Sequence, residues 1–198
     1  MKVIRNLQPA TYYSFRIKSI GTNSLSSVGW SPIINTMTIP LVPSGVKTKN
    51  LSSSSFTLIW NQVSGASSYS VHVFQNVNEI FLSYLVETNK VEVMGLAPAT
   101  LYICHVRATN RLNMSSDVAN ILQRTAPLPP TNVEVLLVRP NLISISWNAV
   151  NGATHYKVNI LSPFTNLTVV TRDTNFTFNE LNYGTMHEIF LISLSQEN

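Results

Sequence analysis

The sequence contains very little charge. Asp, Glu, Lys and Arg together make up 11% of the residues, far below the roughly 25% of ordinary globular domains. The polar surface must therefore consist mostly of Ser, Thr and Asn, which suits strands and turns better than helices held by ion pairs. The formal charge of +4 comes from scattered residues, whereas a nucleic-acid groove clusters its Lys and Arg. We therefore expect no nucleic-acid binding.

Groups that carry chemistry are also scarce. Cys104 is the only cysteine and Asp117 and Asp173 are the only aspartates, so an intrachain disulfide and a multi-cysteine metal site are excluded. No two of the four histidines stand at metal-ligand spacing, and neither a Gly-rich phosphate loop nor a nucleophile elbow occurs. We predict no catalytic residue, no cofactor and no metal, hence no enzyme, although a fold class alone never excludes a grafted site.

Long apolar runs are missing as well. The start, Met1–Arg5, meets charge before any apolar run of the roughly 7–15 residues that a secretory signal needs. No segment approaches the roughly 18–20 apolar residues of a membrane span. We expect no direct membrane insertion, and if the parent protein is extracellular we expect its signal and anchor outside this chain.

The sequence does contain a repeat. The twelve residues Trp60–Val71 return as Trp147–Val158, 87 positions later, with seven identities. A second marker, Thr38-Ile39-Pro40, returns as Thr125-Ala126-Pro127, also 87 later. A fixed period of this length predicts an array of similar structural units.

A third motif occurs three times, with apolar or aromatic residues at every second position after its Thr. Its copies are Leu7, Pro9, Thr11, Tyr13, Phe15, Ile17; Leu96, Pro98, Thr100, Tyr102, Cys104, Val106; and Leu181, Tyr183, Thr185, His187, Ile189, Leu191. Period-two alternation indicates a strand with one buried face. For the complete unit we predict strands at 45–50, 55–60, 68–74, 80–86, 90–94, 100–109 and 117–124. Seven such strands fit a Greek-key sandwich.

These motifs resemble the fibronectin type III family. The resemblance rests on the two Trp strands, the two Tyr strands and the Leu-x-Pro-x-Thr-x-Tyr stretch that is closed by Ala108 and Asn110. It implies an all-β fold of tandem immunoglobulin-like sandwiches. It also implies a non-catalytic function in protein–protein interaction, cell adhesion and spacing, in an extracellular or cell-surface multi-repeat protein.

The markers divide the chain into one complete repeat, 40–126, flanked by two partial ones. Residues 1–39 contain the end of one strand and the last two strands of a sandwich, and residues 127–198 lack the last strand. We expect the chain to be an excerpt of a longer array, since chains normally end at exposed linkers. The alternative is strand complementation, in which the amino-terminal hairpin fills the gap in the third repeat. The proline-rich linkers predict semi-rigid joints.

Strand parity assigns the side chains to the two faces of each sheet. The predicted structural core contains Trp60, Tyr69, Tyr102, Cys104, Trp147 and Tyr156. The resemblance places Tyr13 and Tyr102 at a tyrosine corner, whereas the third copy has His187 and should lack that hydrogen bond. The opposite parity predicts an apolar patch with a basic rim for partner binding, made of His72, Phe74, Ile103, His105 and Arg107; the alternative is scattered surface apolars.

Three further readings remain open. A weak polyanion (heparin-like) site would use Lys47, Lys49, Arg107, Arg111 and Arg124. The repeats would otherwise serve as accessories to a catalytic domain outside the chain. Four sequons, at Asn50, Asn113, Asn166 and Asn175, permit a glycosylated extracellular protein. Trp30 is expected to stack on Arg16 or Lys18.

Overall fold

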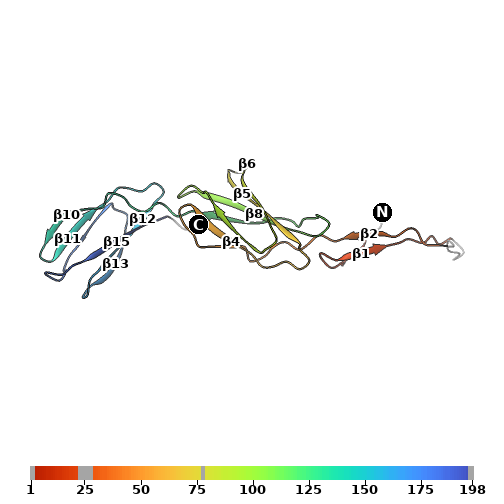
Figure 1. The fold of residues 1–198 in the computed structure, drawn as a ribbon, viewed down its shortest axis with the longest axis horizontal. Coiled ribbons are helices and arrows are strands. Elements are labelled where there is room, and N and C mark those ends of the chain that lie inside the picture. The colour runs from red at the N-terminus through yellow and green to blue at the C-terminus, as the bar shows by residue number, and fades with distance from the viewer. Residues whose placement is uncertain (1–2, 22–28, 77–78, 196–198) are drawn as a thin grey trace.

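The computed structural model describes residues 3–21, 29–76 and 79–195, and in these ranges the chain is all-β without a helix. The strands form three parts that lie end to end along one long axis (Figure 1). The hairpin consists of β1 (Tyr12–Phe15) and β2 (Ile34–Met37). The central sandwich consists of β3 (Lys47–Lys49), β4 (Ser55–Ile59), β5 (Ser68–Asn76), β6 (Glu79–Val86), β7 (Lys90–Met94), β8 (Leu101–Thr109) and β9 (Ala119–Arg124). The C-terminal sandwich consists of β10 (Glu134–Arg139), β11 (Leu142–Ser146), β12 (His155–Leu161), β13 (Asn166–Thr171), β14 (Asn175–Phe178) and β15 (Glu188–Leu194).

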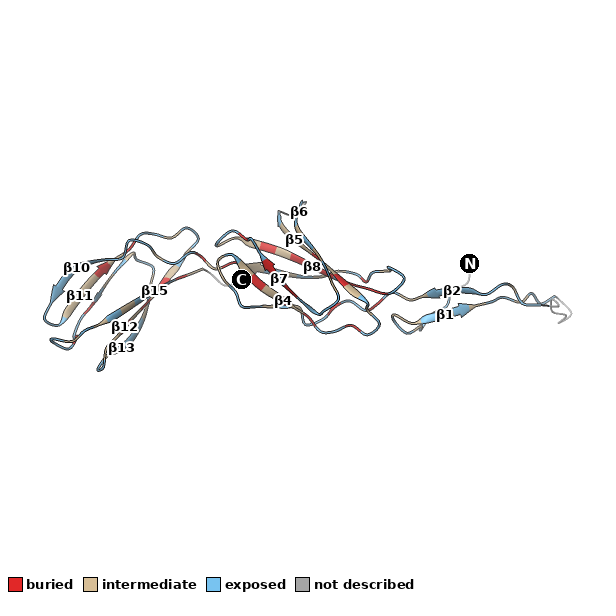
Figure 2. Ribbon diagram, in the orientation of Figure 1, coloured by how far each residue is buried: buried red, intermediate tan, exposed pale blue. Residues whose placement is uncertain are grey.

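The central sandwich packs a three-stranded sheet, β3-β4-β7, against a four-stranded sheet, β6-β5-β8-β9. Its buried residues gather between the sheets, where the inward faces of β4, β5, β7 and β8 meet (Figure 2). Every second residue of β8 from Tyr102 to Val106 is buried, as expected for a strand with one face in the core. The predicted all-β sandwich is confirmed, and each strand boundary lies within two residues of its expected position.

Each sandwich contains the same aromatic pair. The rings of Trp60 and Tyr69 meet edge to face with centroids 5.2 Å apart, and those of Trp147 and Tyr156 do so at 5.4 Å. The tyrosine hydroxyl also accepts a hydrogen bond from a backbone N–H six residues upstream, Val63 N in the central sandwich (2.8 Å). Burial of the rings and satisfaction of the hydroxyl together fix the strand that carries the tyrosine.

The tyrosine corner occurs in two of the three parts. Tyr102 accepts a hydrogen bond from Ala97 N at 2.9 Å, and Tyr13 accepts one from Gln8 N at 2.8 Å. At the third position, both ring nitrogens of His187 are buried without a hydrogen-bond partner within the described residues. The C-terminal sandwich therefore lacks the bond that closes this corner in the other two parts.

The other two parts bury less than the central sandwich. In the C-terminal sandwich the sheets are β10-β11-β14 and β13-β12-β15, and β10 is exposed along its whole length. The outer edge of β15 pairs with no strand in the described ranges. In the hairpin, β1 pairs with β2, and neither strand contains a buried residue. The strand end that we expected before Leu7 is not formed within residues 3–11.

The joints between the parts repeat one contact. A Cβ atom added at Gly65 would lie 2.4 Å from the Cβ of Ala10, and one added at Gly152 would lie 2.2 Å from that of Ala99. All four residues have positive φ. At each joint, a loop of the following sandwich lies directly against the corner loop of the preceding part. The two joints are built alike, because equivalent residues form both contacts.

Candidate partner-binding face

The five residues of the predicted binding face lie together on the outer side of the four-stranded sheet. His72 and Phe74 belong to β5, and Ile103, His105 and Arg107 belong to β8. The register places His72 opposite His105 and Phe74 opposite Ile103. The Phe74 ring lies 4.7 Å from the His105 ring and 6.4 Å from the His72 ring, centroid to centroid. The five positions therefore form one continuous surface across two central strands.

The apolar part of this face extends over all four strands. Phe74 pairs with Ile80 of β6, and Ile103 pairs with Leu122 of β9. Ile80 is 50% exposed and Leu122 is 54% exposed. We call Ile80, Phe74, Ile103 and Leu122 the apolar row. The sequence analysis missed Ile80 and Leu122. Their place in the row depends on how β6 and β9 pair with the central strands, which periodicity alone does not give, and the β5–β6 pairing also contains a bulge.

A polar row runs beside the apolar row. It crosses the sheet through Ser83, His72, His105 and Asn120, and Arg107 lies two residues beyond His105 on the same face. The pKa of His105 is lowered, first by its partial burial and then by the charges of His72 and Arg107. Neither row contains an acidic residue. The imidazole of His105 is thus held toward its neutral form beside a basic rim.

The C-terminal sandwich has different residues at the equivalent positions. There Asn159 of β12 lies opposite Phe190 of β15, where the central sandwich has the two histidines. Leu161 lies opposite Glu188 where the central sandwich has Phe74 and Ile103, so a charged residue replaces one member of the apolar row. The combination of an apolar row and a histidine pair is therefore specific to the central sandwich.

The five residues of the polyanion reading do not form one patch. Lys47 and Lys49 lie on β3 of the three-stranded sheet, whereas Arg107 and Arg124 lie on strands of the other sheet and Arg111 lies in the loop after β8. The Arg124 side chain also donates from Nη1 to the backbone oxygen of Ala99 at 2.9 Å. A linear anion would have to cross both sheets to reach all five charges.

Trp30 forms the predicted cation and ring stack next to the hairpin. The Arg16 guanidinium carbon lies 4.7 Å from the centre of the Trp30 ring, and the Lys18 Nζ lies 5.7 Å from it. The ring is half-exposed. Contacts of this type at exposed sites contribute about 0.5–1 kcal/mol, so the stack helps to order the ends of the two strands.

Cys104 lies inside the core, between the two sheets of the central sandwich. Burial raises the pKa of its thiol to about 12. The thiolate is the reactive form of cysteine, so the folded protein holds this residue in an inert state. Within residues 3–21, 29–76 and 79–195, no three His, Cys, Asp or Glu side chains gather as a metal would require.

No helix with the length and apolar character of a membrane span occurs in the part of the chain that the structure describes. The four sequon asparagines are all exposed: Asn50 and Asn113 lie in loops, and Asn166 and Asn175 begin β13 and β14. Asn50 and Asn113 have positive φ, at 50° and 58°. Each side chain therefore lies at the surface, as attachment of a glycan requires.

Known proteins resemble the chain along most of its length. Human fibronectin type III domain-containing protein 7 is 28% identical over 193 residues, which cover 96% of this chain and 26% of that protein. Mouse receptor-type tyrosine-protein phosphatase eta is 28% identical over 138 residues, which cover 67% of this chain and 11% of that protein. The chain thus spans about a quarter of the length of the human relative.

Among solved structures, the chicken CNTN1 FN1–FN3 domains align with a TM-score of 0.48 and 19% identity, covering 96% of this chain and 74% of theirs. The family model described as "Fibronectin type III domain" matches residues 41–121. This range contains every strand of the central sandwich from β3 to the first half of β9. Residues 41–121 of this chain form a fibronectin type III domain.

Proposed function

We propose that this chain is a non-catalytic interaction and spacer segment of an extracellular or cell-surface protein, and that the outer face of the central sandwich binds another protein. The observation that carries the proposal is the apolar row. Four large apolar side chains lie in register across four strands, with Ile80 and Leu122 about half-exposed. Contiguous exposed apolar groups with a polar rim are characteristic of protein interfaces.

The charges on this face favour a partner with acidic groups. Arg107 is exposed beside the histidine pair, and neither row contains a carboxylate. A complementary surface would present an apolar ridge to Phe74 and Ile103 and carboxylates to Arg107. Charge complementarity of this kind contributes to the association rate and to partner choice.

The joints support the spacer role. Ala10 against Gly65 and Ala99 against Gly152 leave no room for a methyl group at either glycine. Pro40 and Pro127, which lead into the two sandwiches, are buried and lack a backbone donor. Tight contacts and short proline joints resist bending, so the chain holds its parts at defined separations.

A surface location and glycosylation are parts of the same proposal. The four exposed sequons support it because an acceptor asparagine must be reached by the glycosylation machinery. Secretion of the chain from animal cells behind an added signal peptide, followed by peptide mapping after enzymatic deglycosylation, tests each site. Unmodified asparagine at all four positions would contradict this part.

A second candidate is an accessory role beside a catalytic domain. The observation that favours it is the similarity to mouse receptor-type tyrosine-protein phosphatase eta, whose name identifies an enzyme and of which the matched region is 11%. On this proposal the present residues would still bind and space, and catalysis would lie elsewhere in the protein. The weak polyanion function has less support, because its five cations lie on both sheets.

Replacement of Phe74 and Ile103 by Ser, together, tests the binding face. The probe is an array of purified cell-surface ectodomains, screened with the secreted chain. We expect a partner found with the native chain to lose at least about tenfold in affinity, since central apolar anchors carry most of an interface energy. The matched control replaces Phe190 and Ile192 of the C-terminal sandwich by Ser and should bind as the native chain does. Equal binding of both double variants would refute the face.

A further inference from the structure

Asn166, the asparagine of one sequon, lies where the central sandwich begins its apolar row. Asn166 pairs with Leu161 of β12, and Leu161 pairs with Glu188 of β15. These three residues follow the first three members of the apolar row by 86, 87 and 85 positions, and they pair in the same order. A possible site of glycan attachment thus replaces an apolar residue of the equivalent face.

The Asn166 side chain belongs to the outer face of its sheet. Every second residue of β12 from Tyr156 to Ile160 is buried, so Leu161 is in the outward set. Residues directly opposite each other on paired strands share a face, and Asn166 is exposed. Because β13 comes first in the strand order β13-β12-β15, Asn166 stands at one border of this face.

A hollow lies on the same face, beside the residue opposite Asn166. Its volume is about 510 Å³, within the range of about 300–1,000 Å³ that small-molecule sites occupy. The residues that line it are Leu161, Ser162, Pro163, Met186 and Glu188. Three of them are apolar, and the Glu188 carboxylate can accept hydrogen bonds from hydroxyl groups.

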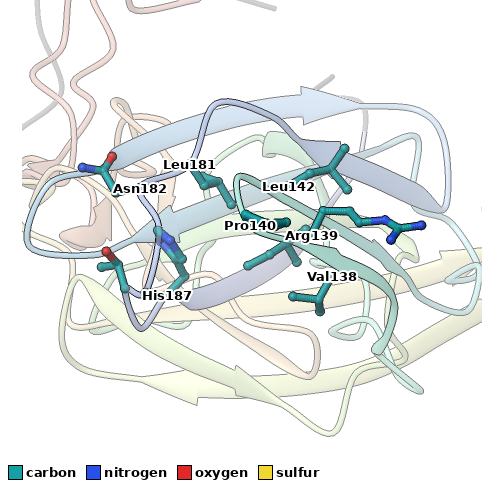
Figure 3. Close-up of a pocket in the computed structure, with 10 residues that line it drawn as sticks. Val138, Arg139, Pro140, Leu142, Leu181, Asn182 and His187 are labelled. Atoms are coloured by element: carbon teal, nitrogen blue, oxygen red, sulfur yellow. The ribbon is translucent and has the colours of Figure 1, made fainter.

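The hollow is separate from the cavity at the His187 corner (Figure 3). That cavity has a volume of about 450 Å³ and is lined by residues of β10, the β10–β11 turn and the loop before β15, among them Arg139 and Asn182. The two share no lining residue. The cavity therefore lies outside the row that begins at Asn166.

The turn between β12 and β13 is closed by hydrogen bonds and presents an aromatic ring. Ser162 N donates to Thr165 O at 2.7 Å, and Thr165 N donates to Ser162 O at 3.3 Å. The Ser162 hydroxyl also accepts from Phe164 N at 3.3 Å. Phe164 is 74% exposed and precedes Asn166 by two residues. A large apolar side chain is thus held in solvent beside the sequon.

These groups match the surface of a sugar. The C–H groups on one side of a sugar ring pack on apolar walls and on the partly negative face of an aromatic ring. Sugar hydroxyls donate hydrogen bonds to carboxylates. Phe164 and Leu161 provide the first kind of contact, and Glu188 provides the second.

The other three sequons have different surroundings. Asn50 and Asn113 lie in loops, and Asn175 begins β14 of the other sheet. None of these three residues belongs to the face that corresponds to the binding face of the central sandwich. Asn166 alone among the four sequon asparagines is placed to carry a glycan across that face.

We propose that an N-linked glycan on Asn166 packs over the outer face of the C-terminal sandwich, along Phe164 and the hollow beside Leu161. The inference rests on the glycosylation part of the proposed function. A covered face here leaves the central sandwich, with Ile80 at the position of Asn166, as the open one. The glycan would thereby direct partners to the apolar row.

Attachment of the glycan is a group transfer. The Asn166 Nδ2 atom forms a bond to C1 of the first sugar of a polyprenyl-diphosphate-linked oligosaccharide. The bond from C1 to the diphosphate oxygen breaks, Nδ2 loses one proton, and polyprenyl diphosphate leaves. No atom is oxidised or reduced.

Radical footprinting of the full 198-residue chain tests the covering. The chain is secreted from animal cells behind an added signal peptide, and its glycans are left intact or removed enzymatically from the folded protein. Peptide mapping should find a glycan on Asn166. Oxidation of Phe164 and Leu161 should become at least about twofold faster when the glycan is removed, because oxidation follows exposure.

Two substitutions separate the Asn166 glycan from the others. Asn166→Gln keeps a neutral amide and should show the faster oxidation of Phe164 without enzyme treatment. Asn175→Gln is the matched control, because it removes a sequon from the other sheet and should leave Phe164 protected. Phe74, at the position equivalent to Leu161, should oxidise at the same rate in every form. Enzymatic removal gives the same comparison in a chain without substitutions.

The outcomes distinguish this inference from the glycosylation that it requires. Glycans at other sequons beside an unmodified Asn166 would overturn the inference and leave the glycosylation proposal in place. A glycan on Asn166 that leaves oxidation of Phe164 and Leu161 unchanged would also overturn the inference alone. Unmodified asparagine at all four positions would contradict both.

Discussion

Asn110 of the central sandwich donates a hydrogen bond from Nδ2 to the backbone oxygen of Thr38, 3.0 Å away, across the joint to the hairpin. The side-chain oxygen of Asn110 accepts from Leu112 N and Met114 N in its own loop. The amide is fully buried. One side chain therefore orders the loop after β8 and attaches it to the preceding part.

Asn110→Ala should destabilise the central sandwich by about 1–3 kcal/mol, because it leaves two backbone N–H groups and one carbonyl without their partners in a buried site. Urea unfolding followed by Trp fluorescence measures the change. Asn120→Ala, at an exposed position of β9, is the control and should stay within about 0.5 kcal/mol of the native chain. Equal midpoints for both variants would show that the loop does not depend on Asn110.

Gly65→Ala and Gly152→Ala should open the joints. The added methyl would lie 2.4 Å from Ala10 Cβ in the first variant and 2.2 Å from Ala99 Cβ in the second. Small-angle scattering should show a changed angle between neighbouring parts. Gly95→Ala is the matched control: Gly95 also has positive φ, at 76°, but an added Cβ meets nothing within 4 Å. It shares the backbone strain of about 1–2 kcal/mol and should keep the native shape.

The Cys104 thiol should react with a thiol reagent only as fast as the central sandwich unfolds. Burial raises its pKa from 9.0 to about 12. Between these two values the unfolded chain releases a proton that the folded chain retains, so the free energy of unfolding should fall as the pH rises above about 9. Cys104→Val lacks this group and should show a shallower decline. Rapid labelling of the folded chain at pH 8 would contradict the buried position.

His187→Tyr should stabilise the C-terminal sandwich by about 0.5–1.5 kcal/mol, the net value of an ordinary hydrogen bond. The new hydroxyl would accept from Asn182 N, as Tyr102 accepts from Ala97 N at 2.9 Å. The substitution also removes two buried nitrogens that lack partners. Thermal unfolding provides the measurement. Tyr102→Phe should lower the stability of the central sandwich by a similar amount, and a cost there without a gain at His187 would show that the third corner cannot close.

The strands of the central sandwich could be predicted closely because both signals are local. Alternation along Phe56–Trp60 and Tyr69–Val73 identifies the inward face of each strand, and turn residues such as Gly65 mark where strands end. The repeat then transfers each assignment to an equivalent strand 85–89 residues away. The division at residues 40 and 127 stays a prediction of the same kind.

The binding face could be predicted only in part. Parity identified Phe74 and Ile103 as outward, since the side-chain period along a strand is two. Ile80 and Leu122 were missed because membership of the apolar row depends on how β6 and β9 pair with the central strands. The bulge in β6 shifts that register in a way that no count along the sequence reveals.

The sequence alone determined the all-β architecture, the inward and outward faces and the missing tyrosine at His187, because each depends on residue types at fixed local spacing. The tertiary structure decided which distant residues meet: Asn110 with Thr38, Ala10 with Gly65, and Arg139 with Asn182 around one cavity. The physical reason is that contacts across strands and joints depend on register and on the path of the linkers, which the local pattern does not specify.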